Sequence, residues 1–335
     1  MKSPNILLSI VAAVTMTFGF STSTLQGQCP ADLNGDGQIN QADVAQLLAN
    51  SGSVPFPTPV VPAWATLLEA SPDPAVVTDA NLRAAIVASG FAWRVRDNAA
   101  NIEMLLVPAG TFMMGCSASN TWACVYEEGP THQVTLDESP THQVTLTQAF
   151  YMGRYEVTQA QWQAKMGNNP SYFSGYSDSP SRPVEQVSWN TIQSFNSATG
   201  LRLPSEAEWE YAYRAATTTA FHGFPGYTSG TNEDYQLGNI AWYQGGGTRP
   251  VGGKFANGLG LHDMAGNVFE WCQDWYGPYS SASVTNPTGP ATGPYRLLRG
   301  GTWDNNSYSL RASQRDVNNP SDAGNGTGFR VARNP

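Results

Sequence analysis

Oxygen-bearing side chains recur at alternate positions in one short stretch near the start of this 335-residue chain. The stretch reads DLNGDGQINQAD, and Gly37 stands at its sixth position, where the chain must turn sharply. Ca²⁺ takes about six to eight oxygen ligands, which a curling loop can offer at every second residue. The spacing therefore predicts a calcium-binding loop, with a metal-free turn rich in Asp and Asn as the alternative. The expected ligands are Asp32, Asn34, Asp36, the Gln38 carbonyl, Asn40 and Asp43.

A helix is expected directly after this loop, over the sequence DVAQLLAN. The segment 28–52 resembles a dockerin repeat, a variant of the EF-hand whose loop also ends in Asp. Ile39 stands where such loops carry their apolar anchor. Dockerins carry two repeats, whereas this chain contains one. The resemblance therefore implies a calcium-stiffened N-terminal module and gives little support to a cohesin-type partner.

Four cysteines, Cys29, Cys116, Cys124 and Cys272, are the only candidates for thiol chemistry. Their spacing matches no zinc site, and no histidine lies nearby in the sequence to complete one. Cys116 and Cys124 enclose the short loop CSASNTWAC, so we expect them to form a disulfide. Cys272 is then either a buried thiol or the partner of Cys29.

Other catalytic signatures are absent from the sequence. The four histidines form no HExxH spacing, and neither a Gly-x-Ser-x-Gly elbow nor a phosphate-binding loop occurs. The net charge of -9, with no run of Lys and Arg, excludes a nucleic-acid backbone as partner. The sequence thus names no catalytic residue.

The first residues predict export. Residues 1–27 combine Lys2, an apolar run from Ile6 to Phe20 and small polar residues, the pattern of a cleaved signal peptide. The apolar run is shorter than the roughly 20 residues that cross a bilayer. We therefore expect a secreted, periplasmic or cell-surface protein that is not inserted in a membrane after cleavage.

The rest of the chain divides by composition into three parts. Residues 53–62, rich in proline, predict a semi-rigid linker. Residues 63–101 predict a small helical lead-in, with a helix that is capped by Thr78 or Asp79 and packs on the C-terminal part of the chain. Residues 102–335 predict one compact unit.

Within that unit, local signals place the secondary structure. The stretch EMLLVPAGTFMMG predicts two strands around a turn. Three helices are expected after Thr158, Ser188 and Ser205, because each of these residues can cap a helix before an apolar face. The sequence PTHQVTL occurs twice, ten residues apart, and we expect its second copy to form the native strand.

Seven blocks, in order, carry a family resemblance. They are MLLVPAGTFMMG, FYMGRYEVTQAQW, PVEQVSWNTIQSF, GLRLPSEAEWEYAYRA, GLGLHDMAGNVFEWCQDW, LRGGTW and GFRVAR. Residues 102–333 resemble the formylglycine-generating enzyme (sulfatase-modifying factor) family. The resemblance implies an α+β fold of the loop-rich, C-type-lectin-like kind, with few short helices, short antiparallel strands and bound calcium.

The resemblance also implies two calcium loops. In the sequence LHDMAGNVFEW, two carboxylates and two carbonyls within eight residues suit a hard cation. The alternative is that Glu270 pairs with an arginine. In the sequence NIAWY, a weaker loop lacks a clear counterpart of the family's aspartate. The implied ligands are Asp263, Gly266, Val268 and Glu270 in one loop, and Asn239 and Ile240 in the other.

Copper is not expected. Enzymes of the family hold Cu(I) with two cysteines that follow a Gly-Gly-Ser turn, whereas this chain reads GGTWDNNSYSLR. Asn305 stands at the position of the first cysteine, and amide oxygens cannot replace thiolates for Cu(I). Thr302, Trp303 and Asn306 complete the set that we expect to face a ligand.

The sequence therefore favours an exported, calcium-binding, non-catalytic binding or scaffold module. Aromatic-rich loops suit a peptide, glycan or protein ligand. The alternative is a sulfatase-modifying oxidase that converts a substrate cysteine to formylglycine, which the family resemblance supports and the missing cysteines oppose.

Overall fold

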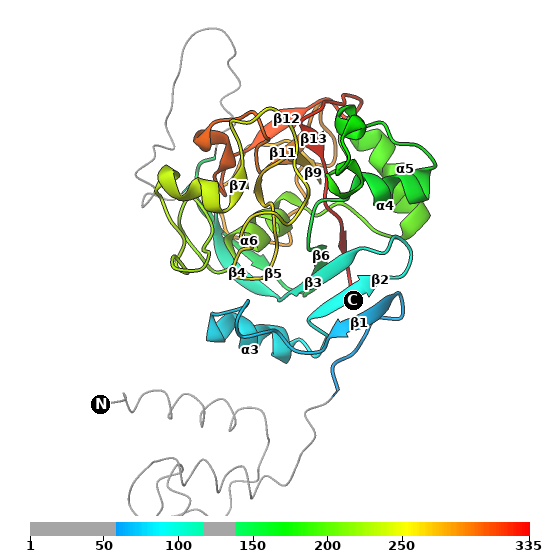
Figure 1. Cartoon of the computed structure of the whole chain (residues 1–335). Coiled ribbons are helices and arrows are strands. Elements are labelled where there is room, and N and C mark those ends of the chain that lie inside the picture. The colour runs from blue at the N-terminus through cyan, green and yellow to red at the C-terminus, as the bar shows by residue number, and fades with distance from the viewer. Residues whose placement is uncertain (1–57, 117–137) are drawn as a thin grey trace, which may run out of the picture. The chain divides into compact units, whose positions relative to one another are not determined.

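The computed structural model describes residues 58–116 and 138–335. The predicted signal peptide, the predicted calcium loop, half of the linker and Cys124 lie outside the described residues. Within the described residues, no helix has the length and apolar character needed to cross a membrane. Figure 1 shows the domain formed by residues 59–335.

The largest sheet joins the start of the domain to its end (Figure 1). All its neighbouring strands are antiparallel, and the last strand pairs with β6. The segment 63–101 contributes two of these strands, which the sequence did not predict, besides the expected helix. In sheet order the strands are β1 (Ala65–Glu69), β2 (Arg94–Asp97), β3 (Glu103–Val107), β6 (Phe150–Gly153) and β14 (Ala332–Arg333).

Three smaller sheets complete the strand pairing. The second copy of the repeat forms β5, as expected. Three pairs, β5–β10, β7–β8 and β9–β13, are parallel, which corrects the expectation of antiparallel strands alone. Parallel neighbours need long connections, and these partners lie far apart in the sequence. The sheets are β10 (Val284–Thr285), β5 (His142–Leu146) and β4 (Gly110–Met114); β12 (Asp316–Asn318), β11 (Arg296–Arg299), β9 (Phe269–Trp275) and β13 (Thr327–Gly328); and β7 (Ala241–Trp242) with β8 (Ala265–Gly266).

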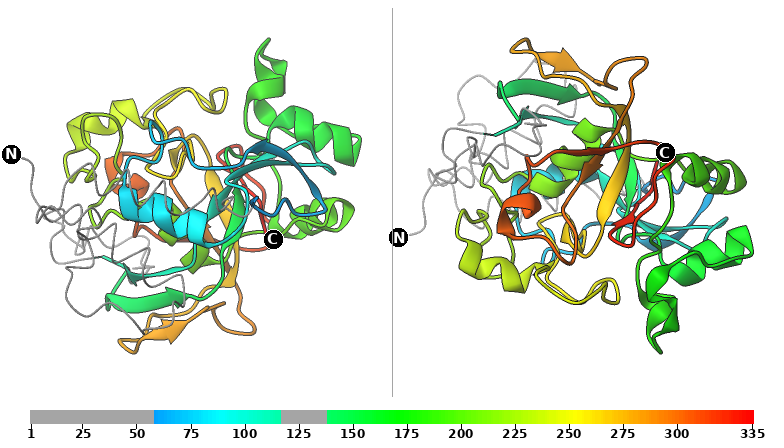
Figure 2. Two further views of the ribbon diagram at one scale, coloured as in Figure 1. Left: turned by 90° about the horizontal axis from the view of Figure 1, so that it is seen from below. Right: turned by 90° about the horizontal axis from the view of Figure 1, so that it is seen from above.

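The helices begin at the capping residues that the sequence indicated. Asp79, Thr158, Ser188 and Ser205 each accept a backbone hydrogen bond in the first turn of a helix. In both views of Figure 2, α4 and α5 stand together at one edge of the domain. The helices are α3 (Ala80–Ala88), α4 (Gln159–Met166), α5 (Trp189–Thr199) and α6 (Glu206–Arg214), with 3₁₀ turns η1 (Tyr172–Gly175), η2 (Ser179–Ser181), η3 (Asp234–Asn239) and η4 (Ser307–Leu310).

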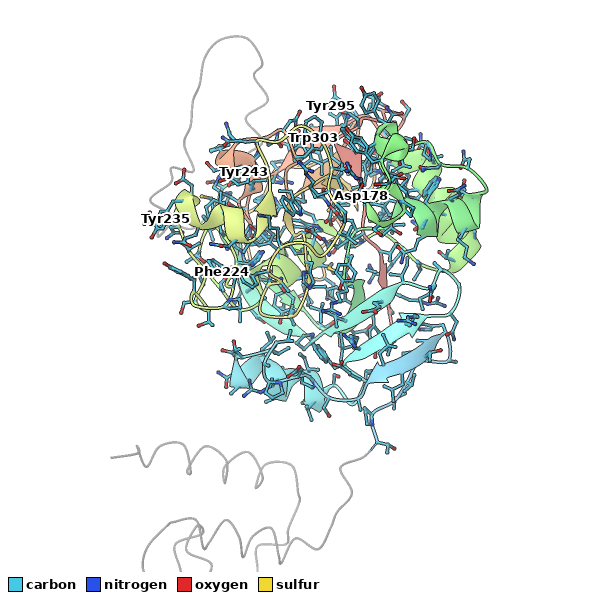
Figure 3. All side chains as sticks on the ribbon, viewed as in Figure 1. Asp178, Phe224, Tyr235, Tyr243, Tyr295 and Trp303 are labelled. Atoms are coloured by element: carbon cyan, nitrogen blue, oxygen red, sulfur yellow. The ribbon has the colours of Figure 1, made fainter. Side chains whose placement is uncertain are left out.

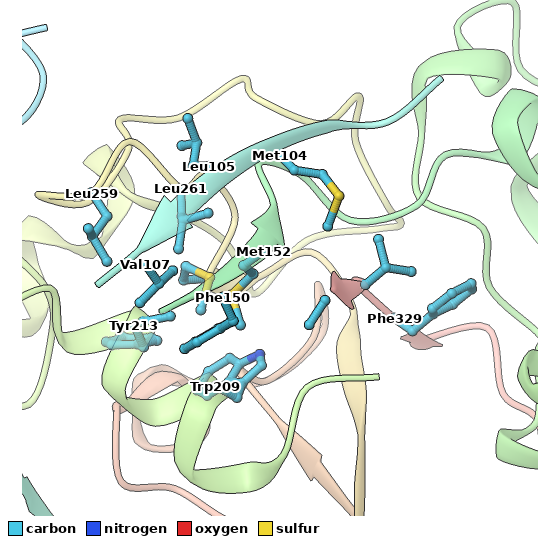
Figure 4. Packing of buried hydrophobic residues seen from close by; sticks show 14 of the residues in the cluster. Met104, Leu105, Val107, Phe150, Met152, Trp209, Tyr213, Leu259, Leu261 and Phe329 are labelled. Atoms are coloured by element: carbon cyan, nitrogen blue, oxygen red, sulfur yellow. The ribbon is translucent and has the colours of Figure 1, made fainter. Parts of the chain in front are cut away.

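The hydrophobic core is centred on α6. This helix packs against β4, β9 and β11. Trp209 and Tyr213 lie one turn apart on its buried face, and Figure 4 shows them facing Phe150 and Met152 of β6. All four side chains are at most 2% exposed. Spacing by four residues puts both aromatic rings on one side of the helix, as its period requires.

Four arginines in the segment 299–330 are also fully buried. Each is at most 1% exposed and bonds a carboxylate of an element that lies earlier in the chain. Burying a charge is costly unless it is paired, and two parallel N–H···O bonds make the best pair. The pairs are Arg299 with Glu210, Arg311 with Glu138 at 2.7 and 2.9 Å, Arg315 with Glu206 at 2.7 and 3.0 Å, and Arg330 with Glu270 at 2.6 Å.

The pair at the centre of this network lies on α6. Glu210 is fully buried and accepts hydrogen bonds from Arg214, Arg299 and the backbone N–H of Gly115. Burial alone would raise its pKa, but the two guanidinium groups hold the pKa of Glu210 below its usual range. The carboxylate therefore stays charged and joins α6 to β11 and to the end of β4.

At the first turn of α6, a second buried carboxyl group has a raised pKa and not a lowered one. The backbone N–H of Glu206 donates to Oδ2 of Asp274 at 2.9 Å. Burial, and then the negative charge of Glu206, raise the pKa of Asp274 to about 7. Asp274 is therefore a buried carboxyl group that gains a charge near neutral pH.

We expect the Arg299→Met replacement to lower the free energy of unfolding by about 3–5 kcal/mol, because it leaves the Glu210 carboxylate buried with one cation fewer. The control is Arg94→Met. The pair of Arg94 with Glu69 is partly exposed, so this replacement should lower the free energy of unfolding by about 1 kcal/mol or less. Urea unfolding of both variants measures the difference. Equal losses would contradict a special role for the buried network.

We expect the Asp274→Asn replacement to remove a pH dependence of stability. The raised pKa means that folded wild-type protein holds a proton between about pH 4 and pH 7, so its stability falls as the pH rises through this window. The free energy of unfolding of the variant, relative to that of wild type, should therefore be about 2–3 kcal/mol higher at pH 8 than at pH 5. Urea unfolding at both pH values tests this, and a constant difference would contradict it.

Candidate functional site

The loop after β11 builds its own support from the residues that were expected to face a ligand. Thr302 is 5% exposed, and its hydroxyl donates to the Asn267 carbonyl at 3.2 Å. Its backbone N–H donates to Oδ1 of Asn305 at 3.1 Å. Asn305 thus closes a tight turn with its side-chain amide. The side chains of Thr302 and Asn305 are occupied within the protein.

The other asparagine of this loop is exposed. Oδ1 of Asn306 accepts the backbone N–H of Tyr308 at 3.1 Å and so caps η4. The backbone carbonyls of Trp303 and Asn305 accept N–H groups of the segment 244–245 at 2.7 and 3.1 Å. The loop is therefore fixed both by its own amides and by the neighbouring segment that follows β7.

Trp303 is the member of the set that reaches the surface beside other aromatic rings. It is half-buried, and its ring meets Phe173 edge-on at 5.5 Å between centroids. Phe173 also contacts Tyr172 and Tyr176, which are 66% and 52% exposed. We call these four residues the aromatic patch. In Figure 3 Trp303 lies in the upper half of the domain, far from β1 and β2.

A buried carboxylate holds the turn that carries the tyrosines. Glu185 accepts the backbone N–H groups of Tyr172 and Phe173 at 3.0 and 2.9 Å. Burial raises the pKa of Glu185 in spite of these bonds. Gly247 allows Phe173 to lie close, because a Cβ at this position would be 2.6 Å from the ring. No pattern in the sequence indicated η1, since an exposed tyrosine is common on any surface.

An arginine covers the outer tyrosine of the patch. The guanidinium carbon of Arg182 lies 4.0 Å from the ring centre of Tyr176. Arg182 donates to Asp178 at 2.7 Å and to the Thr248 carbonyl at 2.6 Å, so its position is fixed. The patch thus combines aromatic surface with a half-exposed carboxylate, and a buried arginine fixes both.

No thiol belongs to this patch. Cys272 lies on β9, is fully buried, and is a free cysteine, which settles the choice left open by the sequence in favour of a buried thiol. Burial raises its pKa well above the usual value. Cys116 is in a disulfide, while its predicted partner Cys124 lies outside the described residues.

The predicted calcium loop at residues 263–270 brings buried carboxylates together. Glu270 bonds Arg330 through both oxygens and accepts Trp209 Nε1 at 2.7 Å, so the pairing with an arginine that we considered is present. Oδ2 of Asp263 accepts the backbone N–H of Gly252 at 2.6 Å, whereas its Oδ1 is buried without a hydrogen-bond partner. Burial raises the pKa of Asp263 to about 6.

A third carboxylate, which the sequence did not indicate, lies beside this loop. Glu156 accepts hydrogen bonds from the Asn267 amide at 2.6 Å and the Val268 backbone N–H at 3.1 Å. Burial, and then the charges of Asp263 and Glu270, raise its pKa well above the usual value. The described residues contain no group of three or more His, Cys, Asp or Glu side chains arranged as a metal site. A cation here would need backbone carbonyls such as those of Gly266 and Val268.

The weaker predicted loop, at Asn239 and Ile240, lies beside a cation of the protein itself. The Lys254 ammonium donates to the Gly238 carbonyl and lies 3.9 Å from the Trp242 ring centre. The Asn239 carbonyl accepts the backbone N–H of residue 255 at 3.0 Å. Calcium binding by Asn239 and Ile240 stays a prediction, and the positive charge of Lys254 opposes it.

Known proteins resemble this chain over most of the domain. Residues 92–335 match the model of the sulfatase-modifying factor enzyme 1-like domain. The chain is 34% identical over 198 residues to the formylglycine-generating enzyme of Thermomonospora curvata, a match that covers 53% of this chain and 63% of that protein. The structure of Treponema denticola variable protein 1 matches with a TM-score of 0.59 and 29% identity, covering 70% of this chain and 95% of that one.

A further relative is much longer than the shared region. The chain is 32% identical over 253 residues to the serine/threonine-protein kinase pkn1 of Chlamydia caviae. The match covers 69% of this chain but only 38% of the kinase. The mixed sheets and few short helices described above agree with the fold that the family match indicates.

Proposed function

This chain belongs to the family with the sulfatase-modifying factor enzyme 1-like domain, and we propose that its domain binds a ligand without performing catalysis. The aromatic patch is the observation that carries this proposal. Aromatic side chains give large contact areas at little cost in conformational entropy, and they dominate binding surfaces. The patch lies beside the loop in which Asn305 stands at the position of a copper-binding thiol.

The ligand that suits this patch best is an extended peptide segment. Tyr172 and Tyr176 offer exposed aromatic surface, and Asp178 next to them offers a half-exposed carboxylate, while the buried Arg182 holds Tyr176 and Asp178 in place. Because Glu185 fixes the η1 backbone, the tyrosines lose little freedom when a ligand binds. If the ligand is a glycan instead of a peptide, sugars should bind at this patch.

The kind of α+β fold, the export of the protein and its N-terminal repeat belong to the same proposal. We assign the domain to the C-type-lectin-like kind of α+β fold, because short strands and long loops surround one central helix. The export signal in residues 1–27 and the dockerin-like calcium repeat in residues 28–52 are proposed from their sequence alone.

We also propose that calcium binds at residues 263–270. Asp263, Glu156 and Glu270 place three carboxylates in one buried region, where Arg330 is a single opposing guanidinium. A divalent cation would satisfy the unpartnered Oδ1 of Asp263 and reduce the repulsion between the carboxylates. Asp263 and the carbonyls of Gly266 and Val268 would hold the ion, and Glu270 would share its oxygens with Arg330.

Calcium should stabilise the domain through Asp263. In the Asp36→Ala variant, which disables the predicted N-terminal loop, we expect calcium at about one hundred times its Kd to raise the Tm by about 5–10 °C relative to a chelator. The double variant Asp36→Ala/Asp263→Ala should lose this shift, because it also lacks the carboxylate oxygen that would bind the ion. Differential scanning calorimetry measures both. If calcium does not change the Tm of the Asp36→Ala variant, the assignment is overturned.

The alternative function, conversion of a substrate cysteine to formylglycine, can be tested together with peptide binding. The probe is a fluorescein-labelled peptide that contains Cys-x-Pro-x-Arg. After incubation with copper and oxygen, we expect mass spectrometry to show no aldehyde above a metal-free blank, because the chain lacks the thiolate pair. Fluorescence anisotropy should show binding that weakens about tenfold in Tyr172→Ala, since each buried aromatic contact contributes on the order of 1–2 kcal/mol.

The matched control for this experiment is Tyr235→Ala, which removes an equally exposed tyrosine outside the patch. It should bind the peptide as wild type does. Aldehyde formation would establish the oxidase, whatever the binding result. Equal binding by both variants would show that the patch is not the surface that holds the peptide.

A further inference from the structure

A second site candidate is a cleft of about 630 Å³ that no residue of the aromatic patch lines. Its walls come from the β5–β6 turn, α5, the connection that leads into α6, β9 and the loop after β10. The volume lies in the range of small-ligand sites. Primary amides are the commonest polar groups in its lining. These side chains, which define what we call the amide cleft, are Gln148, Gln193, Asn196, Gln273, Asn286 and Asn334.

Bonds within the protein hold three of these amides, and one of them is Gln193, whose Nε2 donates to the Trp189 carbonyl at 3.3 Å. Oδ1 of Asn286 accepts the Thr147 backbone N–H at 2.9 Å, and its Nδ2 donates to the Thr147 hydroxyl at 2.8 Å. Arg202 donates to both oxygens of Glu208 at 2.6 and 2.7 Å, and to Oδ1 of Asn334 at 2.8 Å. The polar lining is therefore oriented before any ligand arrives.

One buried acceptor in the lining has no partner. Asn196 of α5 is 8% exposed, and its Oδ1 is buried without a hydrogen bond. Buried polar atoms are normally paired, because an unpaired one loses its bond to water and gains nothing in return. A donor group that enters the amide cleft would supply the missing hydrogen bond. This atom is independent of the amides that are fixed at the rim.

The charges of the lining exclude most ligand classes. Arg202 is its one basic side chain and is neutralised by Glu208, so the lining offers no free cation to an anion. Asp274 adds a carboxyl group, which also disfavours an anion. An apolar ligand would leave the amides without partners. Amides both donate and accept, which matches hydroxyl groups, and Ala149, Leu201 and Pro287 supply apolar contacts.

We propose that the amide cleft binds a short neutral oligosaccharide, with its hydroxyl groups paired to the amides and its C–H faces on the apolar strip. The hydroxyl groups of Ser205 and Thr288 add further partners. The site is separate from the aromatic patch, so the proposal does not depend on what that patch binds.

The experiment uses the full-length protein and three neutral probes, cellobiose, maltotriose and N,N′-diacetylchitobiose. We expect saturation-transfer difference NMR to show binding of at least one probe, and isothermal titration calorimetry to give its Kd. The double variant Gln148→Ala/Gln193→Ala removes two amides from the lining and should weaken binding at least tenfold. Both residues are partly or fully exposed, so thermal unfolding should be unchanged.

The matched control is Gln163→Ala, which removes an exposed amide of α4 that does not line the cleft. Its Kd should equal that of wild type. The proposal is overturned if none of the three probes binds, if the double variant binds as well as the control, or if Tyr172→Ala weakens binding as much as the double variant. Competition by inorganic sulfate would overturn it as well, since it would reveal an anion site.

Discussion

The fold of this domain depends on buried arginines whose partners lie far away in the sequence. Arg299, Arg311, Arg315 and Arg330 each meet a carboxylate at least 60 residues earlier in the chain. A packing that separated any pair would bury an uncompensated charge, which costs several kcal/mol, on the order of the domain's whole stability. The pairs therefore select one arrangement for a chain whose strands are short and whose connections are long. Apolar contacts supply the driving force for folding, and the ion pairs make one packing much better than its competitors.

The same constraint explains how a long loop can present a defined surface. The segment between β11 and β12 begins directly after Arg299, and Arg311 lies within it. Both ends of the Trp303 loop are thus tied to buried carboxylates, Glu210 on α6 and Glu138 before β5. Between these anchors the amides of Asn305 and Asn306 and the bonds to the segment 244–245 hold the loop in one conformation. Such preorganisation lowers the entropy that a ligand must overcome, which is what a binding surface made of loops requires.

The sequence predicted those features whose causes are local. Thr158, Ser188 and Ser205 each cap a helix within three residues of their own position, so the signal and the structure share one short segment. The parallel pairs were not predicted, because their partners are set by the packing of distant segments. The strands β1 and β2 were not predicted either, although β2 pairs with β3 across only a short turn. The residues of the candidate site also fall into those that the sequence indicated and those that depend on tertiary packing. A family motif pointed to Trp303, whereas the exposure of Tyr172 and the burial of Glu156 result from tertiary packing that composition does not encode.

The turn after β11 shows why a shared fold need not carry a shared reaction. Asn305 accepts the Thr302 N–H and so uses its amide to hold the backbone, and its own carbonyl accepts a bond from the neighbouring segment. A thiolate at this position would be a weaker acceptor for the turn but a strong ligand for Cu(I). The residue type therefore decides between support of the loop and metal binding. The buried arginine pairs do not involve this side chain, so the fold can keep its packing whichever of these roles the position has.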